Sequence, residues 1–334
     1  MNKRLFSYSM LILVLISLIL VSGCTGPETS AEAEKELIEE KQEVEEKEEK
    51  QEEKSDEVLP TDIPTEIPAS PPTQKPDPTD EPALPALPPE PQEIEFTAED
   101  GQVLVGRYYP AAVNPAPMVV LMHWAPGDIN DWNEIAPWLQ NRGMTGLSAN
   151  AGTEPWLEPS WFPIISENVS YAAFTFTFRG CEGGCSAFKP DGWLLDAKAA
   201  METARELEGV DPTQLVALGA SIGADGAPDG CKLLNEEFEN SCQGGFSLSP
   251  GHYLTLNYVG VVAALEAESL PKPVWCLAAT GDVTSLEVCQ AAAGDHYRSF
   301  IYEGNYHGME LWAPDFDPNP TDLTLEWLQL TLPQ

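Results

Sequence analysis

The stretch that decides the fold is Gln214-Leu215-Val216-Ala217-Leu218-Gly219-Ala220-Ser221-Ile222-Gly223. Its apolar run, residues 214–220, has the length and composition of a buried strand. The strand breaks at Ser221, and we expect a short helix to follow. Glycines at 219 and 223 permit a tight turn between the two elements, and such a turn exposes the serine oxygen. The sequence therefore predicts a serine presented where a central strand meets a helix.

Short apolar runs alternate with amphipathic stretches on both sides of this turn, as strands and helices do in a mostly parallel sheet. An opening hairpin is predicted from the runs Ile94 to Phe96 and Val103 to Tyr108. Further strands are predicted at residues 117–123, 171–178, 245–248, 274–279 and 297–302. The clearest helices are predicted at residues 131–142, 191–208 and 321–330.

This order of elements resembles the α/β-hydrolase superfamily over residues 94–334, and four local matches carry the resemblance. The resemblance implies an α/β fold with a mostly parallel central sheet and helices on both faces. It is nearest to the dienelactone-hydrolase-like and esterase branches, which need no cofactor. The matches are the serine turn Gly219 to Gly223, the loop Met122 to Gly127 with its following helix, the loop Phe176 to Gly180, and Asp211-Pro212.

A serine nucleophile needs a base, and the base needs an orienting carboxylate. The family's chain order is Ser, then Asp or Glu, then His. His307 and Asp282 each follow the carboxyl end of a predicted strand, where open α/β sheets bind ligands. The predicted triad is therefore Ser221, Asp282 and His307. The competing residues are excluded by position: His296 and Asp295 precede a strand, His252 precedes the candidate acid, and His123 occupies the oxyanion-loop position.

The resemblance also implies an oxyanion hole, in which two backbone N–H groups stabilise the negative charge of the transition state. One donor is expected to be the N–H of Ile222. The other belongs to the loop after His123, where Trp124 replaces the glycine usual in the family. Either Trp124 or Ala125 is therefore the second donor.

Two acids follow the serine at helical spacing, Asp225 and Asp229. They are expected to complement the dipole at the start of a helix. The alternative is that they repel anionic substrates from Ser221. A metal site is not predicted, because Cys181 and Cys185 have no matching second pair of ligands.

The segment Met144 to Ser170 is longer than a simple connection, and long ordered loops are commonly functional. With Trp124, its residues Trp156, Trp161 and Phe162 are candidates for an aromatic wall over the site. Packing over the edge of the sheet is the alternative. The segment has no Lys or Arg, so it does not suggest a clamp for a carboxylate or phosphate.

Seven cysteines divide into one near the amino terminus and six in the predicted domain. An even number of cysteines favours disulfides if the domain is exported, as the amino-terminal segment described next predicts. Local pairing is the most economical of the fifteen connectivities that six cysteines allow. The expected pairs are Cys181 with Cys185, Cys231 with Cys242, and Cys276 with Cys289, and free buried thiols are the alternative.

The amino-terminal residues resemble a bacterial lipoprotein signal, because Lys3 and Arg4 precede an apolar run that ends in Val21-Ser22-Gly23-Cys24. Residues 1–23 are predicted to be removed, leaving Cys24 to carry lipid at the outer face of a membrane. An uncleaved membrane anchor is the alternative. Residues 24–93 are rich first in Glu and Lys and then in Pro, and we expect them to form a disordered stalk.

Composition excludes some functions. Acidic residues outnumber basic ones by 54 to 17, which gives a net charge of −37 and argues against binding to nucleic acid or through a polybasic membrane contact. We therefore expect a lipid-anchored serine hydrolase at the cell envelope that cleaves esters of small substrates. A serine peptidase of the same fold and a surface binding protein with a degenerate fold are the alternatives.

Overall fold

The computed structural model describes residues 84–332 of the chain. The predicted signal segment, Cys24 and the stalk up to residue 83 lie outside the described residues. Just before the first strand, the chain contacts the domain: the backbone oxygens of Leu87 and Pro89 accept hydrogen bonds from Arg142 and Gln140. Among residues 84–332, no helix has the length and apolar character needed to cross a membrane.

A single eight-stranded sheet forms the centre of the domain, with the strand order β1-β2-β4-β3-β5-β6-β7-β8. β2 runs antiparallel to β1 and β4, and all other neighbouring pairs are parallel. This confirms the predicted hairpin and mostly parallel sheet. The strands are β1 (Gln92–Thr97), β2 (Val103–Tyr109), β3 (Ala116–Met122), β4 (Ala172–Phe176), β5 (Val210–Ala220), β6 (Cys242–Leu248), β7 (Val274–Ala279) and β8 (Arg298–Tyr302).

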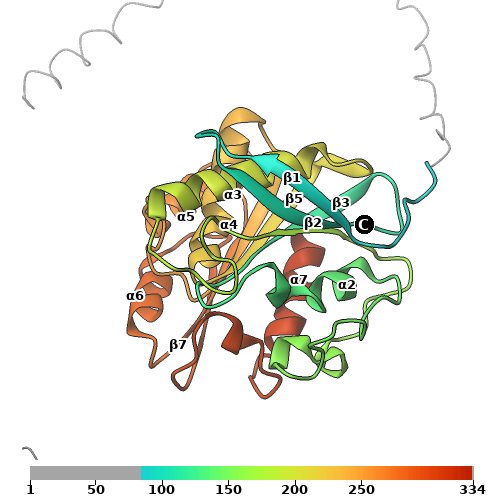
Figure 1. The fold of residues 1–334 in the computed structure, drawn as a ribbon. Coiled ribbons are helices and arrows are strands. Elements are labelled where there is room, and N and C mark those ends of the chain that lie inside the picture. The colour runs from blue at the N-terminus through green and yellow to red at the C-terminus, as the bar shows by residue number, and fades with distance from the viewer. Residues whose placement is uncertain (1–83, 333–334) are drawn as a thin grey trace, which may run out of the picture. The chain divides into compact units, whose positions relative to one another are not determined.

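Helices cover both faces of the sheet (Figure 1). Because neighbouring side chains of a strand point to opposite faces, Val120 belongs to one apolar core and Val119 and Leu121 to the other. The first core is closed by α3 (Pro190–Glu206), α4 (Ile222–Glu237), α5 (Tyr258–Glu266) and α6 (Val283–Ala291). The second is closed by α2 (Ile135–Gln140), α7 (Pro320–Thr331) and the short helix η4 (Gly308–Trp312).

The sequence predicts a short helix after Ser221. In the structure this helix, α4, spans 16 residues. Glycine and proline are poor helix formers, and the residues after Ser221 include several glycines and a proline. Local propensity therefore favours an early end of this helix. In the structure, Gly226 and Gly230 lie against Met122 and Met201, where a Cβ would come within 3 Å of a neighbouring side chain. The need for close packing has overridden the weak helix propensity.

The helix predicted at residues 131–142 is two pieces, a 3₁₀ turn η1 (Ile129–Trp132) and α2. Asp128 caps the first piece by accepting the backbone N–H of Asn130 at 2.8 Å. Glu134 precedes α2 but does not cap it. Its carboxylate instead accepts the backbone N–H groups of Gly146 and Ser148 and so fixes the start of the long loop.

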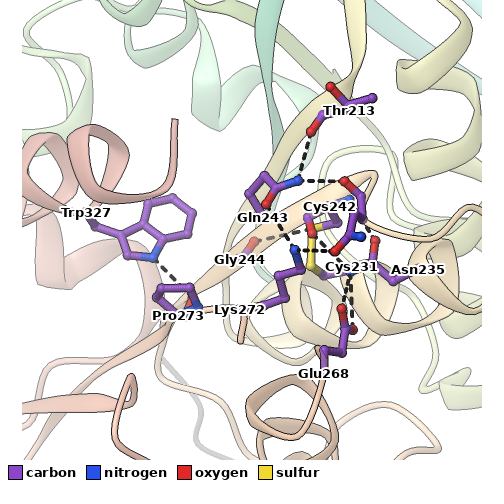
Figure 2. Close-up of a disulfide and its surroundings, with 11 residues drawn as sticks. Thr213, Cys231, Asn235, Cys242, Gln243, Gly244, Glu268, Lys272, Pro273 and Trp327 are labelled. Carbon is purple, nitrogen blue, oxygen red and sulfur yellow. Dashed lines mark hydrogen bonds between the residues drawn. A yellow bond between two sulfur atoms is a disulfide. The ribbon is translucent and has the colours of Figure 1, made fainter. Parts of the chain in front are cut away.

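The six domain cysteines form the three local disulfides Cys181–Cys185, Cys231–Cys242 and Cys276–Cys289, which are the pairs expected from the sequence. Figure 2 shows that the second one ties α4 to the start of β6. Asn235 strengthens the same connection, because its side chain both donates to the backbone oxygen of Cys242 and accepts the backbone N–H of that residue. The Lys272 ammonium donates nearby to the side chain of Gln243 (Figure 2).

Candidate active site

Ser221 occupies a sharp turn between β5 and α4, with a backbone φ of 52°. A non-glycine residue in this left-handed region is uncommon and carries strain. Its neighbours must be small, because a Cβ on Gly219 would overlap the carbonyl group of Gly223, and a Cβ on Gly223 would overlap that of Met122. The backbone N–H of Ser221 donates to Leu248 at 2.8 Å, which fixes the turn against β6.

The structure brings Ser221, His307 and Asp282 together. Nε2 of His307 lies 2.8 Å from Oγ of Ser221, and Nδ1 lies 2.7 Å from Oδ2 of Asp282. Asp282 ends the turn after β7, and His307 lies in the loop after β8, so both stand at the carboxyl edge of the sheet. A carboxylate at Nδ1 requires that nitrogen to donate, which leaves Nε2 free to accept the serine proton.

Electrostatics favour an ionised Asp282. Burial raises the pKa of this carboxyl, but Ser285 and His307 outweigh burial and hold the pKa below its ordinary value. His307 itself is partly open, with a side-chain exposure of 32%. Its backbone N–H donates to the Glu310 carboxylate at 2.9 Å, which fixes the start of η4 beside the imidazole.

The other histidines stand apart from this arrangement. His123 is fully buried, and its Nε2 accepts the backbone N–H of Phe178 at 3.0 Å. Burial lowers the pKa of His123 to about 4, so this side chain is a neutral bridge between two loops. Nδ1 of His252 accepts the backbone N–H of Tyr258, and His296 contacts Glu266.

The two segments that carry the candidate oxyanion donors are in contact, because a Cβ on Gly223 would meet the backbone oxygens of Met122 and His123. Within residues 84–332, no hydrogen bond occupies the backbone N–H of Ile222, Trp124 or Ala125. A Cβ on Gly308 would contact both Trp124 and Ser221, which places the Trp124 side chain next to the serine. Both candidates for the second donor therefore remain available.

The Cys181–Cys185 disulfide loop lies against this oxyanion segment. The backbone N–H of Cys185 donates to the oxygen of Ala125 at 2.7 Å. A Cβ on Gly184 would lie 3.0 Å from the oxygen of Pro126, so the two loops are in close contact. The disulfide consequently stiffens a support of the predicted oxyanion hole.

Asp225 holds the loop after β6 in place, a role that its spacing from Ser221 does not reveal. It lies in the first turn of α4, is 1% exposed, and accepts the backbone N–H groups of Gly251 and Tyr253. The Tyr253 ring lies edge-on to His307 with 6.2 Å between ring centroids. Burial raises the pKa of Asp225 to about 7, against the effect of the backbone donors. Asp225 thus supports a neighbour of the triad histidine.

Asp229 lies one turn further along α4 and is fully buried. Among the described residues, neither of its carboxylate oxygens has a hydrogen-bond partner. Burial and the neighbouring Asp225 raise the pKa of Asp229 well above its ordinary value. Neither acid reaches the surface, which gives no support to the idea that they repel anionic substrates.

A cavity of about 600 Å³ is lined by Tyr306 and Glu310, which flank His307 in the chain, but by none of the three triad residues. Trp124 and Trp156 line it and pack edge to face, with ring centroids 5.6 Å apart. Trp161 and Phe162 do not line this cavity, so their part in an aromatic wall over the site stays a prediction. Phe162, which belongs to the long loop, packs on Trp138 instead. Trp161 lines a separate surface hollow.

The described residues contain no group of three or more His, Cys, Asp or Glu side chains placed to hold a metal ion. Sequence reasoning did not identify Tyr253, Tyr306 or Glu310 as neighbours of the site. Tyr306 and Glu310 flank His307 in the chain, and that proximity was the available signal.

No family model matches the chain. A part of it is similar to the uncharacterized protein YfhR of Escherichia coli, with 31% identity over 133 residues, or 40% of this chain. The match spans 38% of that relative's length.

Solved structures extend the comparison to the whole domain. An esterase of Pyrococcus furiosus superposes with a TM-score of 0.50 and 13% identity, covering 73% of this chain and 91% of the esterase. The 2,6-dihydroxy-pseudo-oxynicotine hydrolase also gives a TM-score of 0.50, with 12% identity, covering 73% of this chain and 69% of that one. Together with the strand order, these likenesses show an α/β-hydrolase fold.

Proposed function

We propose that the protein is a serine hydrolase that cleaves ester bonds of small substrates through an acyl-enzyme. The observation that carries this proposal is the chain of two short hydrogen bonds from Ser221 through His307 to Asp282, at 2.8 and 2.7 Å. The free backbone N–H groups beside Ser221 supply the second requirement of acyl transfer, which is a place for the negative charge on oxygen.

In the proposed reaction, Oγ of Ser221 attacks the carbonyl carbon of the ester while Nε2 of His307 takes the serine proton. The tetrahedral oxyanion is stabilised by the N–H of Ile222 and by one N–H of the Trp124-Ala125 segment. The oxyanion then collapses, and the alcohol leaves with the proton from His307. Water next attacks the acyl-serine, again with His307 as base, and releases the carboxylic acid.

The experiment that tests this proposal uses a fluorophosphonate probe, because an activated serine attacks phosphonates far faster than an ordinary hydroxyl does. We expect labelling of Ser221 alone, and loss of both labelling and esterase activity in Ser221→Ala and His307→Ala. If the folded parent protein neither labels nor hydrolyses any ester of a broad panel, the protein is a binding protein with a degenerate hydrolase fold. Labelling with cleavage of peptides alone would identify a peptidase.

We further propose that Cys24 carries a lipid anchor and that the predicted stalk holds the domain at the envelope of a bacterial cell. The stalk ends before residue 93, because Leu87 and Pro89 contact the domain and β1 begins at Gln92. The three disulfides support an oxidising location. The test is metabolic labelling with a fatty acid: the parent protein should incorporate it, and Cys24→Ser should not. Membrane attachment of the parent without lipid incorporation would contradict this location.

A further inference from the structure

The cavity that Trp124 and Tyr306 line is acidic. The lining includes three acidic side chains, Asp131, Glu154 and Glu310, and no Lys or Arg. None of the three forms an ion pair anywhere in the described part of the chain. The predicted domain as a whole carries 32 acidic and 9 basic residues, so its net charge is negative as well.

The acids differ in depth. Glu154 and Glu310 are exposed at the rim, whereas Asp131 is partly buried and its Oδ2 is closed off from solvent without a hydrogen-bond partner. The Asp131 carboxylate lies directly on Gly127, where any larger side chain would overlap it. Burial, together with Asp128 and Glu154, raises the pKa of Asp131 to about 7. A bound cation would offset this crowding of negative charge.

The walls between these acids are aromatic. Trp124, Trp156 and Tyr306 line the cavity, and Tyr306 packs edge-on to Phe316 with 4.8 Å between centroids. The faces of Trp and Tyr rings attract cations, and a desolvated contact of this kind contributes about 2 kcal/mol or more. Acidic and aromatic groups in one cavity therefore favour the same kind of ligand, an alkylated ammonium group.

The cavity is within reach of a substrate held at the serine. Trp124 lies beside Ser221 through their shared contact with the Gly308 position, and the same residue lines the cavity. Tyr306 precedes His307 in its loop, and Glu310 lies in η4, which begins directly after His307. A substrate with its carbonyl at Ser221 would have to pass Trp124 to reach this cavity, because neither Ser221 nor His307 lines it.

We propose that this cavity binds a positively charged group of the substrate, remote from the ester bond, and that Asp131 and Glu154 determine this specificity. The proposal rests on the proposed function, because it takes Ser221 as the nucleophile. It predicts that esters with a quaternary ammonium group are preferred, and that esters with a carboxylate at the same place are poor substrates.

The test compares esters that differ only in charge. One pair is choline butyrate and 3,3-dimethylbutyl butyrate, which place the cation or its neutral counterpart on the alcohol side. The other pair is the p-nitrophenyl esters of 4-(trimethylammonio)butyrate and 5,5-dimethylhexanoate, which place it on the acyl side. We expect at least one cationic ester to exceed its neutral counterpart about tenfold in kcat/KM, a difference of about 1.4 kcal/mol. The preference should fall with added salt.

Asp131→Asn and Glu154→Gln should each reduce this preference several-fold, and the double variant should bring the ratio close to one. Glu239→Gln is the matched control, since Glu239 is exposed, is acidic and does not line the cavity. For each variant, the ratio of kcat/KM between the cationic ester and its neutral counterpart is compared. This ratio separates a change in specificity from a general loss of activity. As a second readout, tetramethylammonium should quench the tryptophan fluorescence of Ser221→Ala, and less so when Asp131→Asn is added.

The outcomes separate the two proposals. Hydrolysis of both neutral esters with no preference for either cationic ester would overturn the cation site and leave the serine hydrolase standing. A preference that survives the double variant would also overturn it. Absence of hydrolysis and of fluorophosphonate labelling in the parent would overturn the proposed function itself.

Discussion

The change Asp229→Asn should raise the free energy of unfolding, and the gain should increase with pH. Asp229 is fully buried in α4, and within residues 84–332 neither oxygen has a hydrogen-bond partner. Its pKa lies well above the ordinary value of 3.8 because of burial and the nearby Asp225. The folded chain therefore keeps this proton after the unfolded chain has lost it. Asparagine has a similar size and similar polarity but no proton to lose.

The size of the effect follows from linkage. Between pH ~4 and the raised pKa, the folded parent binds one proton more than the unfolded chain, so its stability falls by about 1.4 kcal/mol per pH unit. The variant lacks this loss. The difference in unfolding free energy between variant and parent should thus grow from pH 5 to pH 6, by at most about 1.4 kcal/mol. Other acids titrate in both proteins, so they largely cancel in the difference.

The assay is urea unfolding of the oxidised proteins at both pH values, followed by tryptophan fluorescence. Glu239→Gln, an exposed acid exchanged for its amide, serves as the control and should show no such growth. A difference that stays constant between pH 5 and pH 6, or that shrinks, would mean that Asp229 is already ionised in the folded protein and would refute the reasoning.

Three further changes test the support of the triad. Asp282→Asn should preserve the fold, as measured by circular dichroism, yet lower kcat by up to ~10⁴ because the histidine loses its required tautomer. Asp225→Asn places an amide where two backbone N–H groups need acceptors. Because Tyr253 then shifts against His307, kcat should fall several-fold, and an unchanged kcat would show that Asp225 does not support His307 through Tyr253. Replacing Cys181 and Cys185 by serine opens a loop with a sequence separation of 4. Calorimetry should show that the free energy of unfolding falls by about 2 kcal/mol. Ester kinetics should show a lower kcat, and an unchanged kcat would show that the loop does not hold the oxyanion segment.

The positions of the strands and of the three triad residues could be predicted because each rests on a local signal. Buried parallel strands are continuous apolar runs, and Ser221, Asp282 and His307 each lie within a few residues of the carboxyl end of one. Loops at one edge of a parallel sheet meet in space, so chain position alone placed them together. The local disulfides were predictable for a similar reason, since their partners are close in sequence.

Features that depend on packing were not predictable. The length of α4 follows from the fit of Gly226 and Gly230 against neighbouring side chains, which local propensity does not encode. The contact of Tyr253 with His307 depends on a carboxylate from another element, Asp225. The acidic cavity combines Asp131 and Glu154 with Glu310, which lies far from both in the chain, so no single stretch of sequence reveals it.

The order of the disulfides along the chain bears on how the protein is made. The pairs span 4, 11 and 13 residues, and each one is complete before the next begins. A chain synthesised from its amino terminus therefore presents each of the six domain cysteines with its native partner as the nearest unpaired thiol. Oxidation in step with emergence yields the native connectivity directly, out of fifteen possible arrangements. The protein should accordingly mature with a thiol oxidant alone, and cells that lack a disulfide isomerase should produce it in full yield.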